Sequence, residues 1–453
     1  MINLEEREVE KKSFFRRLII IYFLFGSMFI FFLHSIYSLQ ISEFNDYEIA
    51  ALENKTKEVL VQPVRGIIYD RNGAVIVNNI PSYDLIIKPW KIDNLDIFIK
   101  NISSIIELIP SEIDFVTDNF EQKARYNREL ILKKNLSKIE IARFEVRSFM
   151  FPNAFIDKRY SRTNNYPHLF SHAIGYVGGI NNEQISSILK DQGLNQKETI
   201  FSYSNGFLVG KTGIENKYDK KLRGLFGKKI YEVDARGKLV KLTNYILPKN
   251  GDSLFTSLDL NSHKVAYEKM NNRRGAVVAV EIASGSIVTY ISTPSFSSND
   301  VSNGISSKAF NALLNDPNKP FFDRAAQGRY SPASTIKPAI GLYGLEEKLI
   351  DWNFSINDPG YFILPEDQRV YRGWKKGGHG NVNLNRAIVV SSNTFFFSLA
   401  YQSDIDNLIN HLSNFGFGKN ICLDCFNPDI GLLPTPEWKM NNLNFGWFKG
   451  DTV

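Results

Sequence analysis

A serine and a lysine three residues apart, Ser334 and Lys337, are the pair in this sequence best suited to nucleophilic chemistry. Pro338 follows them, and proline is tolerated only in the first turn of a helix, so we expect a helix to begin near Ser334. At positions i and i+3 the two Cβ atoms would lie about 5–6 Å apart, close enough for a neutral amine to take the serine proton. The pKa of Lys337 would have to fall from about 10.4 to roughly 7–8, which costs about 4 kcal/mol.

A second polar element, Ser391-Ser392-Asn393, lies between the apolar run AIVV (387–390) and the aromatic run FFF (395–397). The motif S-x-x-K alone is weak evidence for a catalytic pair, because an exposed serine and lysine on one helical turn are common. A hydroxyl and a carboxamide between two buried segments could relay a proton and bind a peptide amide. The order S-x-x-K, then S-x-N, resembles the active-site order of penicillin-binding proteins and serine β-lactamases.

Two hairpins are predicted around this chemistry. Residues 67–77 alternate apolar and polar side chains across an Asn72-Gly73 turn, and residues 276–291 do the same across Ser284-Gly285. Residues 86–147 mix amphipathic helical stretches with a charged surface, as in a separate non-catalytic lobe, and residues 40–60 predict a polar, helix-leaning stalk.

The N-terminus predicts a membrane anchor. Residues 18–39 contain no Asp, Glu, Lys or Arg and are long enough to cross a hydrocarbon core of about 30 Å. Four basic residues precede this run (Lys11, Lys12, Arg16 and Arg17), and only acids follow it closely, which places the N-terminus in the cytoplasm and the bulk outside. A cleaved signal peptide is the alternative, but the run is too long and no small-x-small site follows. The net charge of +6 is mild and no basic block indicates nucleic acid.

Cys422 and Cys425 are the only cysteines. A C-x-x-C pair could be redox-active, half of a zinc site or an incidental disulfide. We favour inert thiols or one surface disulfide, which an exported compartment permits.

As a whole, the sequence resembles the class B penicillin-binding proteins, and among them the elongation-specific transpeptidases. The segments that carry the resemblance are RGIIYDRNG (65–73), HAIGYVG (172–178), GKTGIENKYDKKLRG (210–224), GAVVAVEIASG (275–285), GISSKAFNALLNDPNKPFFDRAAQG (304–328), YSPASTIKP (330–338) and WKKGGHG (374–380). The resemblance implies a multidomain α+β protein. Its parts are a cytoplasmic tail (1–17), a transmembrane helix (18–39), an α/β pedestal or dimerisation domain (40–255) and a transpeptidase domain with an antiparallel sheet flanked by helices (256–453).

The implied activity is peptidoglycan D,D-transpeptidation during cell elongation, in the inner membrane with the bulk in the periplasm. Ser334 would attack the penultimate D-Ala of a stem pentapeptide, Lys337 would take its proton, Ser391 would pass it to the leaving amine, and Asn393 would hold the peptide and Lys337. No cofactor is implied. The implied partners are stem peptides, β-lactam antibiotics, a SEDS-type polytopic glycosyltransferase and other elongation proteins, and no nucleic acid. Arg65, Asp70 and Arg71 would form a structural salt-bridge cluster at the domain hinge.

The family also needs a K-[ST]-G strand after the serine. The one match, Lys211-Thr212-Gly213, precedes Ser334 and belongs to a pedestal segment. We therefore expect the chain to be truncated within its catalytic domain, and inactive if it truly ends at residue 453. Two alternatives stay open: a serine β-lactamase, which the anchor and pedestal disfavour, and a non-enzymatic scaffold fragment that binds the glycan polymerase.

Some relatives hold zinc beside the serine with two aspartates, a histidine and a cysteine. Asp358 and His379 match two of these positions, whereas Gly373 and Ser392 occupy the others. Two ligands fall short of the four that a structural zinc site needs, so the sequence predicts no zinc.

Overall fold

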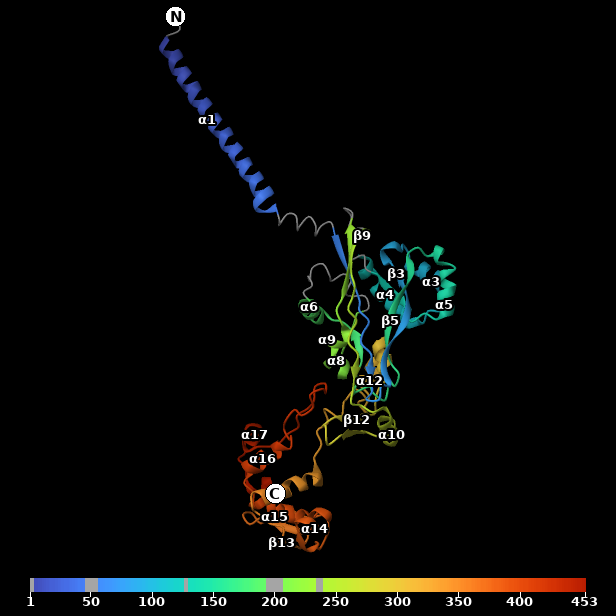
Figure 1. Ribbon diagram of the computed structural model, residues 1–453, viewed down its shortest axis with the longest axis vertical. Coiled ribbons are helices and arrows are strands. Elements are labelled where there is room, and N and C mark those ends of the chain that lie inside the picture. Colours follow the sequence, from blue (N-terminus) through green and yellow to red (C-terminus); the bar gives the residue numbers. More distant parts are fainter. Residues whose placement is uncertain (1–3, 45–55, 126–128, 193–206, 234–238) are drawn as a thin grey trace.

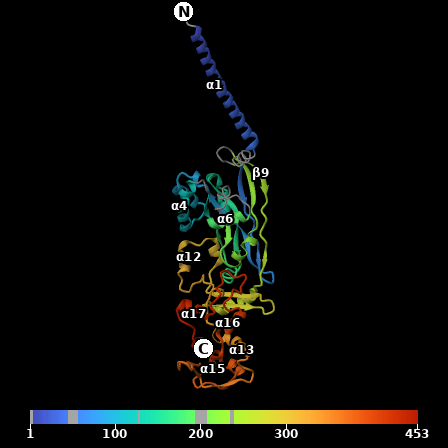
Figure 2. The ribbon, with the colours of Figure 1, turned by 90° about the vertical axis from the view of Figure 1, so that its left-hand side faces the viewer.

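The computed structural model describes residues 4–44, 56–125, 129–192, 207–233 and 239–453. The molecule is elongated. A long helix occupies one end, a strand-rich part the middle, and a lobe of short helices the other end (Figures 1 and 2).

The long helix is α1 (Leu4–Tyr37), and it continues as a π-helical turn through Ser38–Ser42. Its apolar part, Phe14–Ser42, has a mean hydropathy of 2.2 and is long and apolar enough to cross a membrane. Within the described residues it is the single helix of this kind. It includes the run 18–39 predicted from the sequence.

The predicted helical stalk is wrong at its C-terminal end, where Thr56–Val61 forms strand β1; residues 45–55 lie outside the described residues. β1 pairs antiparallel with β8 (Gly227–Val233), which pairs with β9 (Leu239–Ile246). Leu60 is buried against Ile188 and Val209, and Lys228 contacts Glu58 at 2.7 Å. These long-range contacts override a weak local preference for helix.

A five-stranded sheet forms the second part of the pedestal. Its strands are β2 (Ile68–Tyr69), β3 (Val75–Ile87), β4 (Leu130–Lys133), β5 (Ala154–Asn164) and β10 (Leu254–Phe255). β3 is the longest, and its pairing with β5 runs from Val77 opposite Asn164 to Ile87 opposite Ala154. Three helices pack their apolar sides against this sheet: α3 (Leu95–Ser103), α4 (Pro110–Arg125) and α5 (Lys138–Glu145). The helical lobe predicted within residues 86–147 is therefore present, with β4 inserted in it.

Both predicted hairpins are present. β2 and β3 pair across the Asn72-Gly73 turn, where the Asp70 carboxylate accepts the N–H groups of Asn72 and Ala74 at 2.8 and 2.7 Å. The second hairpin pairs β11 (Gly275–Val280) with β12 (Ile287–Thr293). Helix α10 (Leu260–Met270) covers β12, since His263 Nε2 accepts the Tyr290 N–H at 3.1 Å.

The rest of the pedestal consists of short elements, which are β6 (Val177–Gly179), α6 (Asn182–Asp191), β7 (Leu208–Gly210), α8 (Gly213–Lys217) and α9 (Asp219–Arg223). After the second hairpin come α11 (Ser298–Asn303) and α12 (Ser307–Leu314). The helices of the distal lobe are α13 (Lys337–Glu346), α14 (Leu384–Val389), α15 (Asn393–Gln402), α16 (Ile405–Asn414), α17 (Pro436–Leu443) and α18 (Lys449–Thr452). Its strands form two ribbons, β13 (Ser355–Asp358) with β16 (Gly380–Asn383) and β14 (Tyr361–Ile363) with β15 (Val370–Arg372).

Arg65, Asp70 and Arg71 do not form one salt-bridge cluster. Arg65 lies within the pedestal, where its guanidinium contacts Glu215 at 2.6 Å and Asp219 at 2.8 Å. The other two residues join the pedestal to helix α10 and to the second hairpin. Asp70 accepts the N–H of Leu260, the first residue of α10, at 3.2 Å, and Arg71 contacts Glu281 beyond β11 at 3.5 Å.

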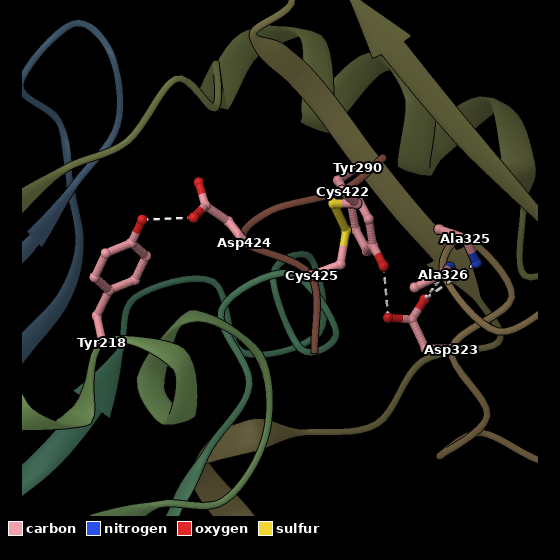
Figure 3. Close-up of a disulfide and its surroundings, with 8 residues drawn as sticks. All are labelled: Tyr218, Tyr290, Asp323, Ala325, Ala326, Cys422, Asp424 and Cys425. Carbon is pink, nitrogen blue, oxygen red and sulfur yellow. Dashed lines mark hydrogen bonds between the residues drawn. A yellow bond between two sulfur atoms is a disulfide. The ribbon is translucent and has the colours of Figure 1, made fainter. Parts of the chain in front are cut away.

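A loop from the distal lobe returns to the pedestal and carries the two cysteines. Cys422 and Cys425 form a disulfide, and Asp424 between them accepts the Tyr218 hydroxyl at 2.6 Å (Figure 3). Cys425 packs against the core that contains Ile68 and Leu222. The sequence left two alternatives for these cysteines, inert thiols or a disulfide, and the structure contains the disulfide.

Candidate active site

Ser334 lies in the short turn that leads into α13. Residues Ala333–Ile336 form a 3₁₀ turn, and the α-helix begins at Lys337, three residues later than predicted. Pro338, in the first turn of α13, has no N–H to donate, so the preceding residues close by tighter bonds such as Lys337 N–H to Ser334 O. The turn leaves the Ser334 side chain exposed to solvent, and α13 lies in the distal lobe (Figure 2).

Lys337 points into the lobe and is buried. Its Nζ donates to Asn393 Oδ1 at 2.6 Å, to Ser391 Oγ at 3.1 Å and to Ser391 O at 3.0 Å. No carboxylate forms an ion pair with it in the described part of the chain, and the Phe396 ring lies 5.4 Å from Nζ. Burial therefore lowers the pKa of Lys337.

Ser391 connects Lys337 to Ser334. Its hydroxyl donates to Ser334 Oγ at 2.8 Å while it accepts from Lys337 Nζ. Within the described ranges no hydrogen bond joins the side chains of Ser334 and Lys337 directly, and the two hydrogen bonds of Ser391 connect them instead. The direct proton transfer inferred from their i, i+3 spacing stays a prediction. Sequence spacing could not show this bridge, because Ser391 lies 57 residues away.

Asn393 is the first residue of α15, and its side chain contacts Lys337. Its side-chain oxygen is occupied by the lysine, whereas its amide nitrogen has no hydrogen-bond partner among the described residues. The amide can therefore donate to a peptide carbonyl placed beside Ser334.

A buried polar layer lies behind these residues. Asp358, at the end of β13, accepts the Ser392 hydroxyl at 2.7 Å and lies 2.9 Å from His379 Nδ1. Burial alone would raise the pKa of Asp358, but the hydrogen bonds from His379 and Ser392 outweigh it and lower the pKa to about 2. Asp358 is therefore a carboxylate at neutral pH.

The Lys211-Thr212-Gly213 segment precedes this site by more than a hundred residues and lies within the pedestal. Lys211 Nζ donates to Gln184 Oε1 at 2.8 Å within the pedestal. Gly213 has a φ of +59°, and a Cβ there would lie 2.5 Å from the Ile174 backbone. The segment is thus packed against the HAIGYVG segment, as its context in the sequence indicated.

Comparisons with known proteins agree with this arrangement. The penicillin-binding protein dimerisation domain matches residues 60–256, and the penicillin-binding protein transpeptidase domain matches residues 275–452. The peptidoglycan D,D-transpeptidase MrdA of Haemophilus influenzae is 33% identical over 99% of this chain and 68% of its own length. The chain belongs to this family of class B penicillin-binding proteins.

Other relatives in the family are MrdA of Acinetobacter baumannii, 36% identical, and MrdA of Escherichia coli, 35% identical, each over 92% of this chain. The chain spans 60% and 65% of their lengths. Among solved structures, the complex between PBP2 and MreC from Helicobacter pylori matches 88% of this chain and 72% of the PBP2 chain, with 28% identity and a TM-score of 0.75.

The residues at the zinc position of some relatives do not fit a zinc ion here. Asp358 is hydrogen-bonded to both His379 and Ser392, and Gly373 offers no side chain, so this place supplies fewer than the four ligands of a structural zinc site. Within the described residues, no three His, Cys, Asp or Glu side chains gather as a metal site would require.

Proposed function

We propose that the whole protein is a membrane-anchored D,D-transpeptidase that cross-links peptidoglycan stem peptides through an acyl-enzyme on Ser334. The observation that supports this best is the chain of hydrogen bonds from Ser334 through Ser391 to Lys337, with Asn393 also bound to the lysine amine. We keep the domain boundaries at residues 39/40 and 255/256 as part of the proposal.

In the acylation step, Lys337 acts in its neutral form. The hydrogen bonds then run from Ser334 to Ser391 and from Ser391 to Lys337. As Ser334 Oγ bonds to the carbonyl carbon of the penultimate D-Ala, its proton passes to Ser391, whose own proton passes to Lys337. The C–N bond to the terminal D-Ala then breaks, and the proton returns through Ser391 to the leaving amine. The side-chain N–H of Asn393 donates a hydrogen bond to a carbonyl of the peptide.

In the second step, an amine of a neighbouring stem peptide attacks the ester at Ser334 and loses a proton to the same relay. A new amide bond forms and Ser334 is released. A β-lactam, as a mimic of D-Ala-D-Ala, enters the first step and is held as a stable ester.

The proposed location is the inner membrane, with α1 as a single anchor, the N-terminus in the cytoplasm and the pedestal in the periplasm. Basic residues before the apolar run and acids after it support this orientation. The PBP2 of Helicobacter pylori has been solved in a complex with MreC, and we propose that this protein likewise works with elongation proteins, among them a SEDS-type glycosyltransferase.

A fluorescent penicillin tests the proposal. We expect the full-length protein, purified in detergent, to be labelled at Ser334, and Ser334→Ala to abolish the label. Lys337→Ala should also abolish labelling while leaving the fold intact. Labelling that persists in Ser334→Ala would refute the assignment.

A further inference from the structure

The turn that carries Ser391 has a backbone conformation that needs support. Ser391 lies between α14 and α15 and has a φ of +54°. This is the left-handed region, which residues other than glycine rarely adopt. The Ser391 hydroxyl must nevertheless stay within hydrogen-bond distance of both Ser334 and Lys337. Contacts on either side of Ser391 must therefore hold the turn in place.

On the C-terminal side, Ser392 is held by Asp358. The Ser392 side chain is 0% exposed, and its hydroxyl donates to Asp358 Oδ2 while it accepts the Phe395 N–H at 3.3 Å as the N-cap of α15. Asp358 is itself fixed, because Oδ1 accepts the Gly360 N–H at 2.8 Å and Oδ2 also contacts His379 Nδ1. One buried carboxylate thus ties the start of α15 to the end of β13.

On the N-terminal side, Val390 is held by Trp374. The indole Nε1 donates to Val390 O at 3.1 Å, and the ring lies 5.3 Å from the ring of His379. Trp374 and Asp358 therefore meet at His379, and together they fix the residues directly before and after Ser391.

The resemblance to the family implies a zinc site at this place in some of its members, and the residues here differ from the ligands that it implies. Ser392 stands where a thiolate would bind the metal, and its hydroxyl points to Asp358. At Gly373 the backbone N–H donates to Gly360 O at 2.8 Å, and a Cβ would lie 3.2 Å from that oxygen, closer than an ordinary van der Waals contact.

We propose that Asp358, with His379 and Ser392, replaces such a metal ion by hydrogen bonds and positions Ser391 and Asn393 for the proton relay. Asp358 is a positioning residue, since it touches neither Ser334 nor Lys337. The inference rests on the proposed function only for its effect on acylation, because the support of the turn is a property of the fold.

The test compares variants of the full-length protein in detergent by two readouts. The first is the acylation rate at saturating penicillin, measured over a pH series. We expect Asp358→Asn and Ser392→Ala to lower it at least tenfold at each pH. Ser403→Ala is the matched control, because Ser403 is equally buried and its hydroxyl bonds to Leu399 O at the other end of α15. It should retain the wild-type rate.

A rescue variant separates positioning from loss of packing. His379→Ala should lose rate as Ser392→Ala does, whereas His379→Asn, whose amide can donate to Asp358 from near the Nδ1 position, should recover most of it. Equal losses in both His379 variants would contradict the proposal.

The second readout is hydrogen exchange of residues 388–395, which needs no substrate. The Ser391 and Ser392 amides are bonded to Ile388 O and Ala387 O, and Asp358→Asn should speed their exchange at least tenfold. Unchanged exchange would overturn the proposal even if acylation fell. Acylation absent from the wild type, with faster exchange in the variant, would refute the proposed function alone. About one zinc per chain in chelator-washed wild-type protein would also overturn the proposal that Asp358 replaces a metal ion.

Discussion

The Ser391 hydroxyl lies 2.8 Å from Ser334 Oγ and 3.1 Å from Lys337 Nζ, so one side chain bridges two groups that do not bond to each other directly. In a serine acylation mechanism this makes Ser391 the shared carrier of the proton in both directions. Removing its hydroxyl should therefore interrupt the reaction while leaving the nucleophile and the base in place.

Ser391→Ala should lower the acylation rate by about 100-fold or more, the range expected for loss of a general acid–base group. Ser334 and Lys337 remain, but no hydroxyl lies between them to carry the proton. The measurement is stopped-flow acylation by a chromogenic cephalosporin, with Ser403→Ala as the control. A rate within threefold of the wild type would mean that Lys337 reaches Ser334 without the bridge.

The acylation rate should rise with pH as Lys337 loses its proton. Because burial lowers the pKa of this lysine, the midpoint should lie below the ordinary value of about 10.4. Asn393→Asp would put a carboxylate at the oxygen that lies 2.6 Å from Nζ, which favours the charged amine and should move the midpoint upward by at least about one unit. An unmoved midpoint would show that the titrating group is not Lys337.

Glu140 should stabilise the pedestal above pH 4.5 and lose this effect in acid. It forms a capping box with Ser137 and an ion pair with Lys133 at 2.7 Å. Burial opposes ionisation, but hydrogen bonds from Lys133 and Ser137 lower the pKa of Glu140 to about 2. A carboxyl whose folded pKa is lowered stabilises the fold above its unfolded pKa, and the effect disappears as pH falls toward 2.

Glu140→Gln should therefore reduce the free energy of unfolding by about 1 kcal/mol at pH 6 and by almost nothing at pH 2. Calorimetric melting at the two pH values measures the difference. A deficit that persists undiminished at pH 2 would mean that the carboxylate charge is not its source.

Val278→Lys should reduce aggregation. In a protein expressed as residues 1–453 alone, β11 pairs only with β12 within the described residues, and Val278 is 46% exposed, so β11 offers an unpaired, Val-rich edge to other copies. Light scattering of concentrated protein is the measurement. Ile139→Lys, which adds the same charge on the exposed face of α5, should have a much smaller effect, and an equal effect would assign the benefit to net charge.

Local features of the fold could be predicted from the sequence because they depend on residues close together in the chain. The Asn72-Gly73 turn with its apolar flanks determines one hairpin, and the uncharged run 18–39 determines a long apolar helix. The motif order from Ser334 to Asn393 placed the chain in its family. Pro338 correctly indicated a helix start, although the turn before it became 3₁₀.

Contacts between distant segments were decided by the tertiary structure. Sequence spacing put Ser334 and Lys337 on one helix turn, but packing of α15 against α13 placed Ser391 between them and Asn393 against the buried amine. Packing likewise brought Ser392 onto Asp358, which the sequence offered only as half of a metal site. The reason is physical: periodicity tells which face of an element is buried, whereas the partner of a buried polar group depends on which elements meet and in what register.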